Sequence, residues 1–222
     1  MDVYEEIREK LLEGEVEEVC DLIEKAIKMK YPAEHIFQKG LVNGINILAE
    51  KFTTSDVLVP EALMVSRALN AGIDIIEEYL PNIERNAGIA IIGTVEGDVH
   101  DLGKNIIKAI VSTMGIKVYD LGVNASKETF IKKIKEYKPN FVMISALLTT
   151  TIYEMKSIID EIKKEGLRDD VIIFVGGFPV TQEYAKEIGA DYFTDNAMEM
   201  KIFLNKNIKK LLKTKKSKYK QD

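Results

Sequence analysis

Apolar residues in the first part of the chain recur at spacings of three and four, the repeat of an amphipathic helix. Three runs follow this repeat: Val16, Val19, Cys20, Ile23, Ala26 and Ile27; Phe37, Leu41, Ile45, Leu48 and Phe52; and Ala62, Val65, Leu69, Gly72, Ile73, Ile76 and Leu80. Breaks separate the runs at Gly14, at residues 31–32, at residues 53–60 and at Pro81. Prolines at positions 32 and 60 suit helix starts. The pattern predicts four antiparallel helices, the first of them short, packed as a small bundle.

The pattern changes after a polar connector over residues 81–87, where short apolar runs begin to alternate with amphipathic helical segments. Strands are expected over residues 88–94, 116–120, 140–145, 171–175 and 190–194, and helices over residues 101–115, 126–137, 151–165, 181–188 and 196–212. Such alternation across short loops predicts a five-stranded parallel sheet covered on both faces, as in flavodoxin-like, Rossmann-type domains. We therefore expect a helical domain over residues 1–82, an α/β domain over residues 83–212 and a lysine-rich tail over residues 213–222.

Composition excludes several classes of protein. Of the 222 residues, 46% are hydrophobic and 30% are charged, and the net charge of −5 argues against a nucleic-acid partner. No run approaches the roughly 20 apolar residues of a membrane span, the N-terminus lacks the features of a signal peptide, and a single cysteine excludes an internal disulfide. We expect a cytoplasmic protein without a membrane partner. The eight lysines between Lys206 and Lys220, with no acid among them, indicate either a solvated helix end or a docking patch for an acidic partner.

The loop after the first predicted strand carries the most distinctive chemistry. His100, one of two histidines in the chain, is flanked by Asp98 and Asp101 and lies between Gly97 and Gly103. In open α/β sheets, ligands bind at the carboxyl ends of the strands. The other loops expected at that edge are residues 145–151, 176–179 and 195–197. They offer small hydroxyls and glycines, and glycine permits close approach of the backbone to a ligand.

Four familiar kinds of site do not match this loop. A phosphate-binding P-loop has four residues between its glycines, whereas five separate Gly97 from Gly103, and Lys104 is followed by Asn105. The dinucleotide fingerprint G-x-G-x-x-G is absent, and Ser145 does not stand in the G-x-S-x-G of a serine hydrolase. A free zinc site needs three or four protein ligands, more than one histidine and a neighbouring carboxylate supply.

A single histidine can complete a metal whose other positions are filled by a macrocycle. In that arrangement Asp98 accepts the other imidazole N–H, which fixes the tautomer, and a hydroxyl such as that of Thr151 extends the relay. A surface or helix-capping histidine is an equally good interpretation of the spacing alone.

Three motifs together resemble the signatures of cobalamin-binding domains. Residues 98–103 fit D-x-H-x-x-G, residues 145–147 fit S-x-L, and Gly176 with Gly177 fits a paired glycine, in the right order at the right strand ends. The helical half is similar to the cap that precedes such domains in methionine synthase and in corrinoid methyl carriers. The loops after strands one and three are most similar to those of stand-alone corrinoid proteins that serve methylamine, methanol, methyl sulfide or methoxy-aromatic methyltransferases.

The resemblance implies that His100 is the lower axial ligand of cobalt in a base-off, His-on corrinoid. Asp98 and Thr151 would form a proton relay behind it. The cofactor-binding residues that the resemblance implies are Phe52 and Val59, which would shield the methyl group from the cap, and Asp98, Val99, His100, Asp101, Gly103, Ser145, Leu147, Thr149, Thr151, Gly176, Gly177 and Ala197. Val59 stands where leucine is usual, and Phe178 replaces a small residue, so its ring would either narrow the slot for the cofactor's own base or turn outward.

The function that the resemblance implies is methyl carriage. A substrate-specific methyltransferase would methylate the cobalamin or related corrinoid to its methylcobalamin form, and an acceptor methyltransferase would pass the methyl group to coenzyme M or tetrahydrofolate. A reductive activase would be a third partner, and the chain would be a carrier subunit rather than a catalyst. A B12-dependent regulatory module and the small subunit of an adenosylcobalamin mutase are the alternatives, and the methyl donor stays open.

Overall fold

The computed structural model of the chain describes residues 2–44, 47–48, 59–80, 88–112, 114–194 and 197–215. The chain forms two compact units, Met1–Asn82 and Ile83–Asp222. The first unit is helical, and the second is built on a parallel sheet. Of the helices in the described part of the chain, none combines the length and the apolar character needed to cross a membrane.

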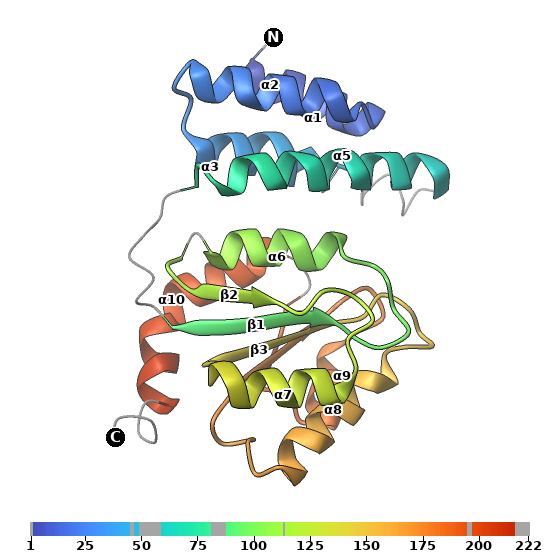
Figure 1. The fold of residues 1–222 in the computed structure, drawn as a ribbon, viewed down its shortest axis with the longest axis vertical. Coiled ribbons are helices and arrows are strands. Elements are labelled where there is room, and N and C mark those ends of the chain that lie inside the picture. Colours follow the sequence, from blue (N-terminus) through green and yellow to red (C-terminus); the bar gives the residue numbers. More distant parts are fainter. Residues whose placement is uncertain are drawn as a thin grey trace. The chain divides into compact units, whose positions relative to one another are not determined.

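The described part of the first unit is helical, as the spacing of its apolar residues predicts (Figure 1). Its helices are α1 (Val3–Glu13), α2 (Val16–Lys28), α3 (Ala33–His35), which continues directly into the π-helix η1 (Ile36–Val42), and α5 (Val59–Glu77). Helix α1 ends at Gly14, whose φ of +75° is left-handed and where an added Cβ would lie 2.6 Å from the Cβ of Met64. Glycine is therefore required where this turn packs against α5.

The π-helix departs from the regular α-helix that the apolar repeat predicts. Ile36 and Leu41 are five positions apart, as are Phe37 and Val42, and all four side chains are buried. A π-helix pairs residues five apart, so both pairs can face the interior. The sequence pattern did not reveal it, because Phe37 and Leu41 also satisfy the α-helical spacing of four.

The second unit contains a five-stranded sheet in which every neighbouring pair of strands is parallel. Its strands are β1 (Ile89–Thr94), β2 (Lys117–Asp120), β3 (Phe141–Ser145), β4 (Ile172–Gly176) and β5 (Tyr192–Phe193), in the spatial order β2-β1-β3-β4-β5. The helices are α6 (Leu102–Ser112), α7 (Lys127–Tyr137), α8 (Tyr153–Lys164), α9 (Gln182–Ile188) and α10 (Ala197–Lys215). This strand order is that of flavodoxin-like domains, so the predicted fold class is confirmed.

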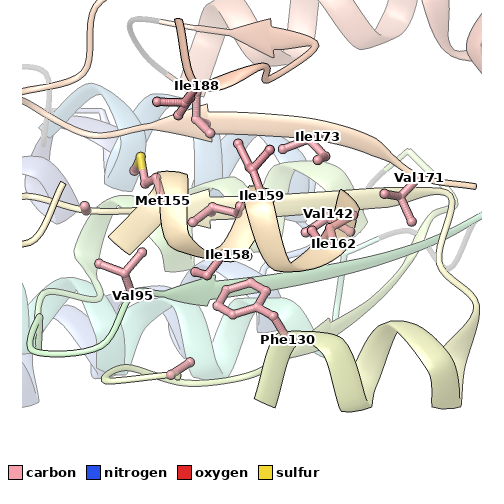
Figure 2. Close-up of a cluster of buried hydrophobic side chains, with 14 of the residues drawn as sticks. Val95, Phe130, Val142, Met155, Ile158, Ile159, Ile162, Val171, Ile173 and Ile188 are labelled. Carbon is pink, nitrogen blue, oxygen red and sulfur yellow. The ribbon is translucent and has the colours of Figure 1, made fainter. Parts of the chain in front are cut away.

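The sheet is buried on both faces, by α6 and α10 on one side and by α7, α8 and α9 on the other (Figure 1). Successive residues of β1 alternate between the faces: Ala90 and Ile92 join the core under α6 and α10, and Ile91 joins the other core. Figure 2 shows part of that second core, in which Ile159 of α8 and Ile173 of β4 belong to one buried cluster. Burial of both faces explains why the strands are nearly continuous apolar runs in the sequence.

The strand order creates a switch point between β1 and β3. The chain leaves β1 for α6 on one face of the sheet and leaves β3 for α8 on the other, so the two loops diverge at the carboxyl edge. Thr94 pairs in register with Ser145, and Ser145 pairs in register with Gly176. The loops that carry the three predicted motifs therefore begin side by side along one edge.

Candidate functional site

The carboxylate of Asp98 joins the loop after β1 to the loop after β3. Its Oδ1 accepts hydrogen bonds from the ring Nδ1 of His100 at 2.7 Å and from the backbone N–H of the same residue at 3.0 Å. Its Oδ2 accepts from the backbone N–H groups of Leu147 at 2.7 Å and Leu148 at 3.3 Å, and from the hydroxyl of Thr151 at 2.9 Å. Because the side chain is fully buried, these donors replace the water that an ionised carboxylate needs.

The hydrogen bonds keep Asp98 ionised at neutral pH. Burial is the largest influence on the pKa of Asp98 and raises it, but the donors on Leu147, His100 and Thr151 together outweigh it. The pKa of Asp98 is lowered from 3.8 to about 2. An ionised carboxylate has no proton to donate, so the proton in its bond with the His100 ring lies on Nδ1.

In the neutral imidazole of His100, a proton on Nδ1 leaves Nε2 as the nitrogen without a proton. With Nδ1 donating to Asp98, the available electron pair of the imidazole is on Nε2, as in histidines that bind metals through that atom. The His100 side chain is 44% exposed, whereas the carboxylate behind it is fully buried. The structure thus brings the three residues of the predicted relay, Asp98, His100 and Thr151, into hydrogen-bond contact.

The rest of the D-x-H-x-x-G motif starts helix α6. The carbonyl of Asp101 accepts from the backbone N–H of Asn105 at 2.8 Å, a first helical turn. Gly103 is exposed, and an added Cβ there would meet no atom within 4 Å. Val99 is 71% exposed. Val99 and Gly103, on either side of His100, are therefore both exposed to solvent.

The loops after β3 and β4 approach each other at the paired glycines. Gly177 has a φ of +131°, and an added Cβ would lie 1.8 Å from the carbonyl oxygen of Ala146. No other residue fits this position without moving one of the two loops. An added Cβ at Gly176, the last residue of β4, would make only an ordinary van der Waals contact, since the nearest atom is 3.8 Å away. The glycine pair thus combines one strict packing requirement with one open position.

The other predicted slot residues of the second unit differ in exposure. Ser145 is half-buried at the end of β3, while Leu147 and Thr149 are exposed. Phe178 is 89% exposed, so its ring takes the outward one of the two expected orientations. Ala197 begins α10, and its side chain lies outside the described part of the structure.

Several predictions fall on residues that the structure does not describe. Phe52 lies outside the described residues, and Val59 begins α5 with a side chain that is not described. The lysine-rich tail is described only as far as residue 215. The roles expected for these residues stay predictions.

Two polar contacts support the histidine loop, and sequence reasoning did not single them out. Asn124, which has a φ of +52°, accepts from the N–H of Gly97 at 2.8 Å, and its own N–H donates to the carbonyl of Asp98 at 2.9 Å. The buried ammonium of Lys104 donates to both carboxylate oxygens of Asp120, at 2.7 and 2.8 Å. Asparagine tolerates the left-handed conformation better than most residues, which is a weak signal for the first contact. For the contact between Lys104 and Asp120, no rule of sequence spacing predicts that the two residues meet.

Among the described residues of this site, His100 is the one side chain with a ring nitrogen available to a metal. Within the described ranges, no three His, Cys, Asp or Glu side chains gather in a group that could hold an ion. His35, the other histidine of the chain, belongs to the helical unit. His100 therefore fits a metal that brings its other ligands with it.

Comparisons with known proteins agree with this arrangement. A family model described as a B12 binding domain matches residues 88–200, and a second model with the same description matches residues 3–77. Dimethylamine corrinoid protein 3 of Methanosarcina acetivorans is 37% identical over 195 residues, which cover 87% of this chain and 91% of the relative. Trimethylamine corrinoid protein 2 of Methanosarcina mazei is 35% identical over 199 residues, which cover 88% of this chain and 91% of the relative.

The fold also has a counterpart among solved structures. The monomethylamine corrinoid protein of Methanosarcina barkeri matches with a TM-score of 0.78 at 29% identity, covering 92% of this chain and 97% of that one. The helical unit and the sheet unit thus each match a B12 binding domain model, and one solved corrinoid protein covers both. The chain belongs to the family of B12-binding corrinoid proteins.

Proposed function

We propose that His100 is the lower axial ligand of a corrinoid cobalt and that the chain carries a methyl group between two methyltransferases. The proposal rests on the pairing of Asp98 with His100. A 2.7 Å hydrogen bond to a buried, ionised carboxylate leaves Nε2 as the free nitrogen of a partly exposed ring. Membership of the corrinoid protein family supplies the metal that such a ring would bind.

The loops around His100 expose apolar side chains that a ligand with an apolar face would cover. Val99, Leu147 and Leu148 are exposed apolar side chains on the two loops that Asp98 joins. Covering such side chains stabilises the bound state by roughly 25 cal/mol per Å² of apolar surface removed from water. The open backbone at Gly103 permits close approach of a ring. A corrin ring would present an apolar face to these side chains and would leave a metal position for His100.

The chain's own residues would bind and orient the cofactor. When bound, the corrinoid supplies a cobalt ion that accepts and releases a methyl group. His100 would bind the metal through Nε2, and Asp98 would hold the ring in the tautomer that keeps this nitrogen unprotonated. The ionised carboxylate of Asp98 accepts from Nδ1 of His100 through one oxygen, and the hydroxyl of Thr151 donates to the other oxygen of the same carboxylate. Thr151 would thereby moderate how strongly His100 holds the metal.

The displaced base of the cofactor would lie in a slot at the carboxyl edge of the sheet. The proposed lining is Ser145, Leu147, Thr149, Gly176, Gly177 and Ala197. Two observations support this lining. The residues lie at or just after the carboxyl ends of neighbouring strands. The close packing of Gly177 on Ala146 also fixes the distance between the loops after β3 and β4. The outward ring of Phe178 leaves this lining to the smaller residues.

The names of the matched relatives support the choice of the methyl donor's class: they are monomethylamine, dimethylamine and trimethylamine corrinoid proteins. We propose that this chain receives its methyl group from a methylamine methyltransferase and delivers it to a second methyltransferase that acts on coenzyme M or tetrahydrofolate. A reductive activase would restore cofactor that has been oxidised. The helical unit would cover the methyl-bearing face, with Phe52 and Val59 as its predicted contacts.

Replacing each histidine in turn tests the ligand assignment. The full chain and its His100→Ala and His35→Ala variants are grown with ¹⁵N-labelled histidine, loaded with hydroxocobalamin and reduced to the Co(II) state. Electron paramagnetic resonance then distinguishes an axial ¹⁵N, which splits the signal in two, from the ¹⁴N of the cofactor's own base. We expect the ¹⁵N splitting in the wild type and in His35→Ala, and its loss in His100→Ala. An ¹⁵N splitting that persists in His100→Ala would refute the assignment.

Methyl carriage is tested separately from cofactor binding. The loaded wild-type protein is reduced with titanium(III) citrate and treated with methyl iodide, and its absorption spectrum is recorded before and after exposure to light. We expect a methylated form that light converts back, because cobalt–carbon bonds are photolabile. A loaded protein that takes up no methyl group would refute the carrier role while leaving corrinoid binding intact.

A further inference from the structure

A buried hydroxyl at the end of β1 holds the peptide group that bears the histidine. Thr94 is the last residue of β1 and is fully buried, and its Oγ1 donates to the carbonyl oxygen of His100 at 2.8 Å. The strand lies between β2 and β3, in the interior of the sheet. The backbone of Thr94 is itself fixed, because its N–H donates to the carbonyl of Gly122 and its carbonyl accepts from the N–H of Ala125. The hydroxyl therefore belongs to a buried residue whose backbone N–H and carbonyl are both hydrogen-bonded.

The two backbone groups of His100 are held by different side chains. Its N–H donates to Oδ1 of Asp98 at 3.0 Å, and its carbonyl accepts from Thr94 at 2.8 Å. The direction of the N–H depends on the φ angle of His100, and the direction of the carbonyl depends on its ψ angle. Together the two bonds restrain both soft backbone angles of a residue that lies outside any helix or strand.

Asp98 does not depend on Thr94 for its position. Asn124 bonds the N–H of Gly97 and the carbonyl of Asp98, and the Asp98 carboxylate is also bonded to the loop after β3. Loss of the Thr94 hydroxyl would therefore release the carbonyl of His100 and leave the carboxylate in place. This separates Thr94 from the relay of Asp98, His100 and Thr151.

We propose that Thr94 is a positioning residue for the axial ligand, whose hydroxyl fixes the ψ angle of His100 and so aims Nε2. The inference rests on the proposed role of His100 as ligand. A ligand that is already held in its binding geometry loses less conformational freedom when the cofactor arrives. Because Thr94 is fully buried, it would not contact the cofactor itself, and its hydroxyl would act through the bond to His100.

Thr94→Val and Thr94→Ser form a matched pair of variants. Valine keeps the shape of threonine without the hydroxyl, and serine keeps the hydroxyl without the methyl group. In the cofactor-free full chain, the N–H of His100 keeps its bond to Asp98 in Thr94→Val, but the residue opens more easily because its carbonyl has lost a hydrogen bond. Amide hydrogen exchange at His100 should therefore be about tenfold faster than in the wild type. Exchange at Leu147, whose N–H bonds Asp98, should be unchanged. Thr94→Ser should match the wild type at both amides.

The same variants are then loaded with hydroxocobalamin. Thr94→Val should lose the cofactor about tenfold faster on dilution and show a smaller fraction of the ¹⁵N-split Co(II) signal, and Thr94→Ser should restore both. Equal exchange at His100 in all three proteins would overturn the proposal. So would a serine variant as impaired as the valine variant, or faster exchange at His100 and Leu147 alike, because either result would show a general loss of packing.

The exchange experiment needs no cofactor, so it separates this inference from the proposed function. If His100→Ala keeps its ¹⁵N-split signal, the ligand assignment has failed, whatever Thr94 does. If His100→Ala loses that signal and Thr94→Val behaves as the wild type in exchange and in cofactor retention, His100 is the ligand and Thr94 does not position it.

Discussion

Replacement of Asp98 by asparagine isolates the charge at the centre of the site. The two side chains have the same shape, but the amide carries one acceptor oxygen and one NH₂ donor in place of two acceptor oxygens. Oδ1 of Asp98 faces two donors and Oδ2 faces three. Whichever way the amide turns, its NH₂ group faces donors, as would the O–H of a protonated carboxyl. Asp98→Asn is therefore a good model of the protonated wild type.

The size of the effect follows from the pKa of Asp98. A native pKa of about 2 against an ordinary value of 3.8 corresponds to about 2.5 kcal/mol of stability at pH 7. Because the folded state has the lower pKa, this contribution is complete well above pH 4 and is lost as the pH falls through about 2. At pH 3, about 1.3 kcal/mol remains. Asp98→Asn should lower the free energy of unfolding by about 2.5 kcal/mol at pH 7 and by about half as much at pH 3.

Urea unfolding of the cofactor-free protein, followed by circular dichroism at the two pH values, measures both differences. Asp160→Asn is the matched control, because Asp160 is an exposed carboxylate that pairs with Lys156 on the surface of α8. Its effect should stay below about 0.5 kcal/mol at either pH. A penalty for Asp98→Asn that is equal at pH 7 and pH 3 would refute the reasoning, since a loss that does not depend on ionisation cannot arise from the charge.

Two further predictions concern packing around the site. Gly177→Ala should destabilise the cofactor-free protein by about 3 kcal/mol or more, because a Cβ 1.8 Å from the carbonyl oxygen of Ala146 forces two loops apart, whereas Gly166→Ala, at a left-handed glycine with open space, should cost about 1 kcal/mol. Equal melting temperatures for the two variants would contradict this. Lys104→Met should cost about 2 kcal/mol by leaving Asp120 without its buried cation, and adding Asp120→Asn should recover part of that loss in urea unfolding. A double variant less stable than Lys104→Met would contradict the ion-pair argument.

The three relay residues that the sequence predicts are joined through their side chains. Asp98 and His100 are two positions apart in one loop, and the strand-edge rule brings Thr151 to them from the neighbouring loop. Thr94 and Asn124, in contrast, bond to backbone groups of the histidine loop. Every residue type offers the same backbone carbonyl and N–H, so no pattern of residue types marks such contacts. They become visible only when the path of the loop is known.

The strands also differ in how closely the sequence predicts their bounds. Strands buried on both faces are continuous apolar runs, and this is why the sequence predicts β1, β3 and β4 nearly residue for residue. The edge strand β5 is shorter than the predicted residues 190–194, since it covers Tyr192–Phe193 only. At its start the carboxylate of Asp191 accepts from the backbone N–H of Ile173, so a side chain takes the place of a ladder bond there. Apolar content alone cannot distinguish these two ways of pairing.

Thr151 and Thr94 give the site two independent controls, because Thr151 bonds the carboxylate of Asp98 and Thr94 bonds the carbonyl of His100. Oδ1 bonds His100 alone, and Oδ2 bonds the loop after β3 alone. A change at Thr151 alters the charge that reaches the imidazole but leaves both backbone bonds of His100 in place. A change at Thr94 alters the direction of the imidazole but leaves the charge of Asp98 as it was. If His100 is the axial ligand, the chain can set the strength of that bond and its direction through different residues, and one can be varied while the other is kept.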